Sequence, residues 1–260
     1  MDLQFNAYRR TDPPWEMLRP HLHGELELLF PLTDGDQIFI DNISYPLRRG
    51  RLYLMDAGVP HRSRFHGQQA YDRCILHFPL TSAQVLGVMD LPELLAAHGC
   101  CVTLSEEEFS RCRRLFDRLL LQQTTLTDSL HRIAAFAELL ALMVDKWCAS
   151  APPSLSAADP VMASVVSHIR AHLAEDLSLD TLAAQFYLSK SALCHRFKAA
   201  TGFTVTEYII LCRIRYAGVL LHRGASVREA GESAGFGDNA HFIRTFRRVT
   251  GMTPGQYAKT

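Results

Sequence analysis

The chain has 260 residues, of which 48% are hydrophobic, so it can hold two domains that each have a core. The formal charge is zero but uneven: residues 160–260 hold 12 Lys/Arg and 7 Asp/Glu (+5), and residues 1–159 hold 15 and 20 (−5). A basic C-terminal part favours contact with phosphates, and no signal-peptide core or membrane-length apolar run occurs, so we expect a cytoplasmic protein without a membrane partner.

The N-terminal part is predicted to be a small β-domain. Residues 1–20 are polar and aromatic, as in a covering loop or an edge strand. Residues 21–80 contain short apolar or alternating runs separated by turn residues, and these runs are ELELLFPL, DQIFIDN, ISYPLRR, GRLYLMDA and DRCILHFPL. Strands at this close, regular spacing predict a double-sheet jelly-roll barrel.

Two segments within these strands carry histidines. His21, His23 and Glu27 form an H-x-H-x3-E pattern, and His61 follows the segment that starts at Gly50. Even offsets put the first three side chains on one face of a strand, and the second segment can return His61 to the same side. The two segments resemble the cupin motifs, in which the matching positions hold a divalent metal ion, for which imidazole and carboxylate are suitable ligands.

The resemblance to cupins is incomplete. Asp56 stands where the second motif has Pro, and Phe65 stands where it has Asn. Two interpretations remain open: the four residues bind a divalent metal, or they line a ligand cavity without one. Trp15 and Tyr45 are further candidates for that cavity, whereas Arg62 also fits a solvated strand edge.

Residues 81–150 show helical periodicity. One apolar stripe runs from Phe109 to Leu120, and a second helix is expected from Leu130 to Trp147. The two helices can cover the open side of the barrel or pair with a second subunit. An Ala/Ser/Pro-rich linker follows, and a further helix is expected from about Pro160 to Ala174.

Residues 177–258 repeat one pattern twice. A short helix is followed by a break and a capped second helix, whose inward pair is Leu193 and Phe197 in the first copy and Phe242 and Phe246 in the second. This is the arrangement of a helix-turn-helix unit. Between the copies, residues 205–222 are expected to form one helix of roughly 27 Å, close to the spacing of successive major-groove faces.

The stretches LSKSALCHRFKAATG, RIRYAGVLL and AGFGDNAHFIRTFRRVTGMTP resemble the AraC/XylS family of transcriptional regulators. The resemblance implies a tandem helix-turn-helix domain that binds double-stranded DNA, and a sensor domain that binds a small metabolite such as a sugar. It also implies an N-terminal arm at the ligand pocket, a homodimer through the helices after the barrel, RNA polymerase as a partner, and activation of transcription.

The outward faces of the two second helices are the candidate DNA-reading surfaces. Their outward positions are predicted to face base edges or nearby phosphates, since Arg suits guanine and Asn suits adenine. These positions are Ser191, Cys194, His195 and Lys198 in the first unit, and Asn239, Ala240, Arg244 and Arg247 in the second.

We therefore predict an α+β chain with a cupin-like jelly-roll barrel over residues 1–100 and a helical dimerisation segment over 101–150. A linker spans 151–159, and an all-α tandem helix-turn-helix domain spans 160–260. The seven cysteines show no C-x-x-C pair, and no catalytic set stands out, so we expect reduced thiols and no enzyme. Two alternatives remain: a metal-dependent cupin enzyme fused to a DNA-binding domain, and a ligand-independent regulator whose barrel only dimerises.

Overall fold

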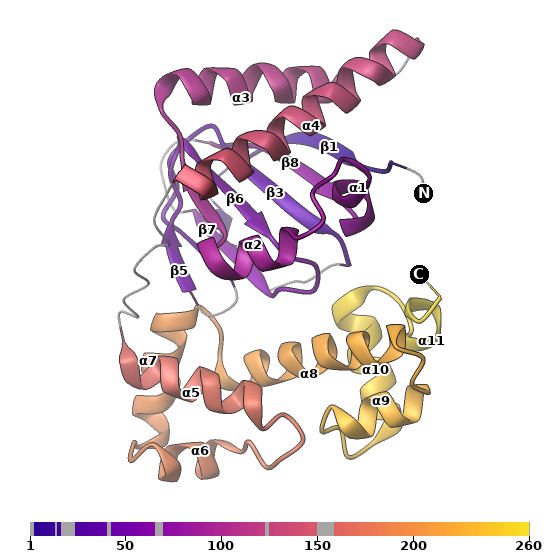
Figure 1. Ribbon diagram of the computed structural model, residues 1–260. Coiled ribbons are helices and arrows are strands. Elements are labelled where there is room, and N and C mark those ends of the chain that lie inside the picture. The colour runs from indigo at the N-terminus through magenta and orange to yellow at the C-terminus, as the bar shows by residue number, and fades with distance from the viewer. Residues whose placement is uncertain are drawn as a thin grey trace.

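A computed structural model describes residues 3–13, 15–16, 24–40, 43–65, 70–122, 125–149 and 159–259. The N-terminal β-part lies on one side and the helical C-terminal part on the other (Figure 1). Within the described ranges, no helix is both long and apolar enough to cross a membrane.

The β-part consists of two antiparallel sheets. The five-stranded sheet has the order β1-β8-β3-β6-β9, and the four-stranded sheet has the order β2-β7-β4-β5. The strands are β1 (Asn6–Asp12), β2 (Trp15–Glu16), β3 (Leu26–Pro31), β4 (Gln37–Ile40), β5 (Ile43–Pro46), β6 (Arg51–Met55), β7 (His61–Phe65), β8 (Tyr71–Phe78) and β9 (Cys101–Thr103).

Two strands lie where the sequence did not predict them. Strand β7 comes from the segment with His61, whose alternation HRSRF contains two arginines and therefore lacks an apolar signal. Strand β9 falls in the range expected to be helical, because only its pairing with β6 makes this short segment a strand. The described part of the arm forms β1 and β2, which pair with β8 and β7.

One face of the five-stranded sheet is covered by helices (Figure 1). These helices are α1 (Leu80–Val85), α2 (Leu91–His98), α3 (Glu106–Leu119) and α4 (Leu126–Ala149). Strand residues Leu28 and Leu54 pack with Phe116 of α3 and Phe136 of α4 in one buried cluster. Helix α4 begins at Leu126, one turn before the expected start, because Asp128 and the Thr125 hydroxyl cap its first turn reciprocally.

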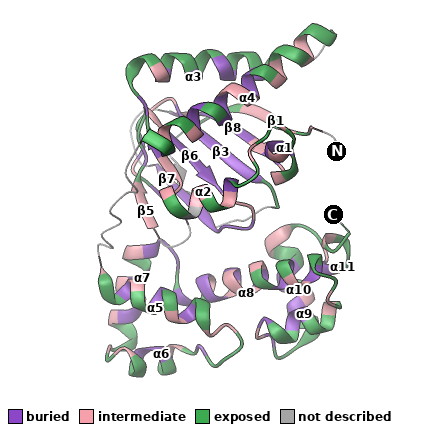
Figure 2. Cartoon of the chain, in the orientation of Figure 1, coloured by how far each residue is buried: buried purple, intermediate pink, exposed green. Residues whose placement is uncertain are grey.

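The opposite face of that sheet contacts the four-stranded sheet. We call the apolar residues between the sheets the interior cluster; they are Leu29, Ile38, Ile40, Leu47, Tyr53, Met55, Val59, Phe65, Tyr71 and Ile75. Because side chains alternate along a strand, β3 directs Leu28 to the helices and Leu29 to this cluster. Figure 2 shows the buried residues concentrated along β3 and β6.

The C-terminal part is all helical in the described residues. Its elements are α5 (Pro160–Ala171), α6 (Leu179–Gln185), α7 (Lys190–Thr201), α8 (Val205–His222), α9 (Val227–Ser233), α10 (Asn239–Thr250) and α11 (Pro254–Tyr257). Helix α5 ends before the expected Ala174, since His172 leaves the helical region at φ −125°. The predicted linker lies outside the described residues, apart from Asp159.

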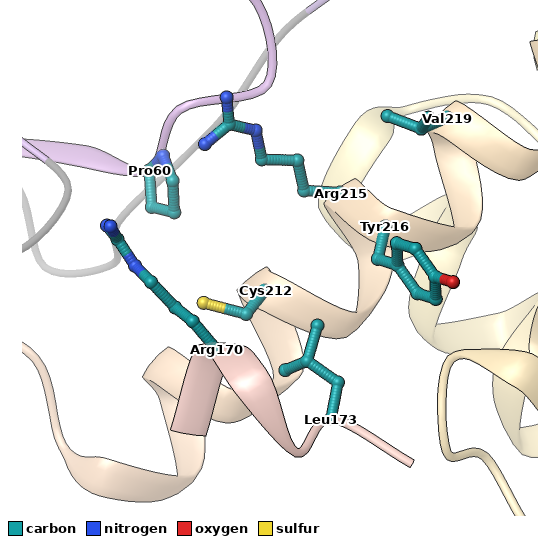
Figure 3. A pocket seen from close by; sticks show the side chains of 7 residues that line it. All are labelled: Pro60, Arg170, Leu173, Cys212, Arg215, Tyr216 and Val219. Atoms are coloured by element: carbon teal, nitrogen blue, oxygen red, sulfur yellow. The ribbon is translucent and has the colours of Figure 1, made fainter. Parts of the chain in front are cut away.

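Helix α8 passes between two bundles, with α5, α6 and α7 at one end and α9, α10 and α11 at the other (Figure 1). Each bundle has its own buried cluster, one around Leu193 and Phe197 and one around Phe242 and Phe246. The middle of α8 also lies near the β-part, where a pocket opens beside Pro60. In Figure 3 the side chains of Arg170 and Arg215 extend toward the Pro60 loop.

Candidate nucleic-acid interface

The first helix-turn-helix unit consists of α6 and α7. The Ser178 hydroxyl caps α6 by accepting from the Thr181 amide at 3.2 Å, and the Ser189 hydroxyl caps α7 by accepting from the Ala192 amide at 3.1 Å. The turn between them contains Tyr187 at φ +54°, which is 96% exposed. These local signals fix both helix starts, so Leu193 and Phe197 face the core as predicted, with no exposed surface.

The second unit, α9 and α10, repeats this construction. The Ser226 hydroxyl caps α9 through Glu229, and the Asp238 carboxylate caps α10 by accepting from the His241 amide at 2.6 Å. Gly235, at φ +86°, stands where the first unit has Tyr187. The inward pair Phe242 and Phe246 is again fully buried.

The ends of the second helices match in detail. In α7, the buried Thr201 hydroxyl donates to the Phe197 carbonyl at 2.7 Å and accepts from the Phe203 amide at 3.1 Å. In α10, the Thr250 hydroxyl donates to the Phe246 carbonyl at 2.9 Å and accepts from the Met252 amide at 3.2 Å. Left-handed glycines, Gly202 and Gly251, then end the two helices. The chain therefore contains one structural unit twice.

Six of the eight predicted DNA-reading side chains lie on the outer sides of α7 and α10, whereas Cys194 lies at the flank of α7 and Asn239 is the first residue of α10. At about 100° per residue, positions 191, 195 and 198 lie opposite the buried pair of α7, and positions 240, 244 and 247 lie opposite that of α10. Seven of the eight predicted residues are exposed and Cys194 is half-buried; the exposed ones are Ser191, His195, Lys198, Asn239, Ala240, Arg244 and Arg247.

Charged side chains elsewhere on these helices hold the units together. The Arg196 guanidinium binds the Asp159 carboxylate through two contacts of 2.7 and 2.9 Å, which joins α7 to the start of α5. This hydrogen-bonded arginine lowers the pKa of Asp159. The Lys190 ammonium lies 2.5 Å from a carboxylate oxygen of Asp180, which joins α7 to α6. Arg196 is thus placed to stabilise the fold, and it points away from the outer side of α7.

The two units are spaced by α8, whose 18 residues match the predicted range. The Thr204 hydroxyl and Glu207 form a capping box at its start. The helix buries Tyr208 and Leu211 against the first unit, and Ile214, Ala217 and Leu221 against the second. One continuous, doubly anchored helix therefore carries both outer faces.

A second candidate site lies between the two sheets of the β-part. Glu27 is 7% exposed, and its Oε2 lies 3.0 Å from His77 Nε2 and 3.5 Å from His61 Nε2. Glu27 and His77 face each other in the β3–β8 register, and His61 comes from β7 of the other sheet. The structure thus brings Glu27 and His61 together, two of the four predicted residues, and adds His77, which sequence reasoning missed.

Further polar groups surround these residues. Arg73 is 5% exposed, and its guanidinium donates to the Asp12 carboxylate at 2.7 Å and lies 4.3 Å from the centre of the Tyr71 ring. The Tyr8 ring packs edge-on against His77, with ring centres 5.7 Å apart. Burial first, and then the nearby Glu27 carboxylate, raise the pKa of Tyr8. The site therefore offers both charges and neutral hydroxyl groups.

The remaining predicted pocket residues are placed as follows. His21 and His23 lie outside the described residues. Trp15 belongs to β2, and Tyr45 is half-buried on β5 with its ring 6.4 Å from that of Tyr53. Among the described side chains, no group of three or more His, Cys, Asp and Glu residues is arranged to hold a metal ion.

The interpretation of Arg62 as a solvated charge is wrong. Arg62 is 5% exposed, and its guanidinium lies 5.6 Å from the Phe39 ring centre and 5.8 Å from that of Phe203. It points away from the interior because it alternates with His61 on β7. The packing of the C-terminal part on this strand buries it, which a single-strand pattern cannot reveal.

Comparison with known proteins agrees with the duplicated unit. A family model described as a helix-turn-helix domain matches residues 182–260. An AraC-like transcription regulator of Streptomyces antibioticus is 35% identical over 103 residues, which are 39% of this chain and 34% of that protein. In this region the chain is similar to AraC-like transcription regulators.

Two other known proteins match over more of the chain. The HTH-type transcriptional activator RhaR of Enterobacter sp. (strain 638) is 24% identical over 248 residues, which are 94% of this chain and 88% of that protein. The crystal structure of ToxT from Vibrio cholerae matches 98% of this chain and 96% of that chain at 11% identity and a TM-score of 0.42. The chain spans about a third of the length of the first curated relatives that it matches.

Proposed function

We propose that this chain is a member of the AraC/XylS family, that it is a cytoplasmic, sequence-specific DNA-binding regulator of transcription, and that it has no catalytic activity. The observation that carries the proposal is the duplicated unit, which presents two outer helix faces on one connecting helix. Residues 182–260 also match the helix-turn-helix model. Helix-turn-helix proteins read DNA by placing such a second helix in the major groove.

The side chains of the two outer faces differ in their capacity to read bases. Arg244 and Asn239 on α10 suit bidentate contacts with guanine and adenine, whereas α7 offers Ser191 and His195. Each face carries a cation suited to phosphate contact, Lys198 on α7 and Arg247 on α10. We therefore propose that α10 provides most of the base discrimination and that α7 adds weaker readout and phosphate contacts.

The test begins with duplexes that the intact protein selects from a random pool. Arg244→Ala is expected to weaken binding to the selected site by roughly 1–3 kcal/mol and to relax the preference at the base pairs contacted. Fluorescence anisotropy at fixed salt measures both effects, because affinities depend strongly on salt.

Arg113→Ala is the matched control for Arg244→Ala. It removes the same charge from an exposed position on α3, in the other part of the chain, and is expected to leave the site preference unchanged. Failure of the intact protein to enrich any sequence, or equal effects of the two substitutions, would contradict the proposed function.

We further propose that the β-part is a cupin-like sensor in which a small metabolite such as a sugar binds between the sheets. The buried residues Glu27, His61 and Arg73, with the half-buried His77, support this, since buried charges beside hydroxyl-bearing rings suit hydrogen bonds to a polar ligand. His21 and His23 stay candidate ligand or metal residues, as do Trp15 and Tyr45 for the cavity wall. A thermal-shift screen against a metabolite panel, repeated with His77→Ala, tests this: hits must stabilise the wild type and lose their effect in the variant.

Activation of transcription, contact with RNA polymerase, and a dimer through α3 and α4 belong to the same proposal. The exposed apolar residues Leu121, Leu126 and Leu130 near the α3–α4 turn support the dimer. Limited proteolysis within residues 150–158 tests the proposed boundary, because it should release a fragment that binds the selected DNA more weakly than the intact dimer.

A further inference from the structure

Strand β4 directs its side chains to two different parts of the molecule. Ile38 and Ile40 belong to the interior cluster between the sheets, whereas Phe39 is 2% exposed and belongs to the buried cluster of the first helix-turn-helix unit. This follows from the alternation of side chains along a strand. Adjacent residues of one strand therefore contact the proposed ligand site and the proposed DNA-binding unit.

The Phe39 ring rests on Gly202, the residue that ends α7. Gly202 has φ +76°, and a Cβ atom placed there would lie 2.4–2.6 Å from three carbons of the Phe39 ring. No other residue type at this position could leave the ring in place. The absence of a side chain at Gly202 thus makes room for the Phe39 ring. Gly202 lies one helical turn after Lys198, which is on the outer side of α7.

The neighbouring strand β7 repeats the arrangement. In the β4–β7 register, Ile40 pairs with His61 and Phe39 pairs with Arg62. His61 faces Glu27 between the sheets, while the Arg62 guanidinium lies over the rings of Phe39 and Phe203. Two adjacent strands therefore connect the polar interior to the same end of α7.

The second unit lacks such a seat. Gly251 ends α10 at φ +79°, as Gly202 ends α7, but a Cβ atom at Gly251 would have no neighbour within 4 Å in the part of the chain that the structure describes. Two glycines with the same backbone role thus differ in burial and in the contact with Phe39, since Gly202 is buried and Gly251 is exposed. Both positions need glycine for their positive φ, but only Gly202 also needs it to leave space for a neighbouring ring.

We propose that Phe39, seated on Gly202, is a joint that couples the space between the sheets to recognition helix α7. The proposal rests on the proposed function and names how its two parts communicate. A ligand that shifts β4 or β7 moves Phe39 or Arg62 against the end of α7. Because the contact is closely packed, α7 must move in response. Because coupling between two sites is reciprocal, DNA bound at α7 acts on β4 in return.

The reciprocal effect can be measured without knowing the ligand. Hydrogen exchange of the full chain is followed with and without a duplex that the intact protein has selected. In the wild type, DNA is expected to change the exchange rates of the β4 and β7 amides by at least about twofold. Phe39→Ala retains DNA binding but loses this change, and Phe39→Leu, which keeps an apolar side chain without the ring, reports the same loss if the alanine variant does not fold.

The two glycines supply the control. Gly202→Ala displaces the ring and speeds exchange in β4 without DNA, whereas Gly251→Ala imposes the same backbone conflict and leaves β4 unchanged. If the two glycine substitutions change hydrogen exchange in β4 equally, the proposed coupling through Phe39 is wrong. It is also wrong if the DNA-bound wild type and DNA-bound Phe39→Ala show the same exchange in β4. A wild type that selects no DNA overturns the proposed function instead, while the glycine pair still decides whether the contact exists.

Discussion

The matched threonines at the ends of α7 and α10 give a prediction that the structure makes quantitative. Thr201→Val removes the hydroxyl that accepts from the Phe203 amide in a site where Thr201 is 1% exposed, so water cannot replace it. A buried donor without a partner costs about 1–3 kcal/mol. Thr250→Val removes the same pattern from a half-buried site, where the Met252 amide can bind water, so its cost should be below about 1 kcal/mol.

Native-state hydrogen exchange of the full chain measures this difference. A change of 1.4 kcal/mol is tenfold in an equilibrium constant, so amides of α8 that exchange through unfolding should exchange roughly 5- to 150-fold faster in Thr201→Val. In Thr250→Val the same amides should change by no more than about fivefold. Equal acceleration in both variants, or a larger effect at Thr250, would refute the argument that burial sets the cost.

Other features of the structure lead to three further predictions. Since Arg196 lowers the pKa of Asp159, this pair stabilises the junction of α5 and α7 above the unfolded carboxyl pKa, and the stabilisation is lost as pH falls through the lower folded value. Asp159→Asn should therefore flatten the acid-induced loss of helicity, followed by circular dichroism from about pH 5 to pH 2. Substituting Glu for Leu126 and Leu130, which are 78% and 56% exposed, should shift the sedimentation of the protein from dimer to monomer without loss of helicity. Trp147→Phe should cost less than about 1.5 kcal/mol in urea unfolding, because the indole N–H has no partner among the described residues.

The helix-turn-helix part could be predicted because its signals are local. Ser189 and Asp238 cap helices whose inward residues follow at fixed helical spacing, and both helices end at a glycine. Such signals involve residues within one or two helical turns of each other, so they can be recognised in the sequence alone. The start of α4 and the end of α5 shifted by about one turn, because α4 begins at the cap formed by Thr125 and Asp128 and α5 ends where the backbone of His172 leaves the helical region.

The polar site between the sheets and the contact between the β-part and the C-terminal part could not be predicted from local sequence signals. His77 meets Glu27 only through the register of two strands that are 50 residues apart in the chain. Phe39 and Arg62 alternate with residues of the interior, so their own strand marks them as solvent-facing. Their burial is created by the C-terminal part, and a prediction from strand alternation alone assigns them to the wrong environment.

The uninterrupted helix α8 has a consequence for how such a protein can change during evolution. One residue inserted into its 18 would rotate the second unit by about 100° and advance it by about 1.5 Å. Three base pairs added between the half-sites would give a similar rotation, since B-DNA has about 10.5 base pairs per turn, but would advance the DNA by about 10 Å. If the two units read two half-sites as proposed, no small insertion in the protein compensates for one in the DNA, and this chain cannot adjust the spacing of the half-sites step by step.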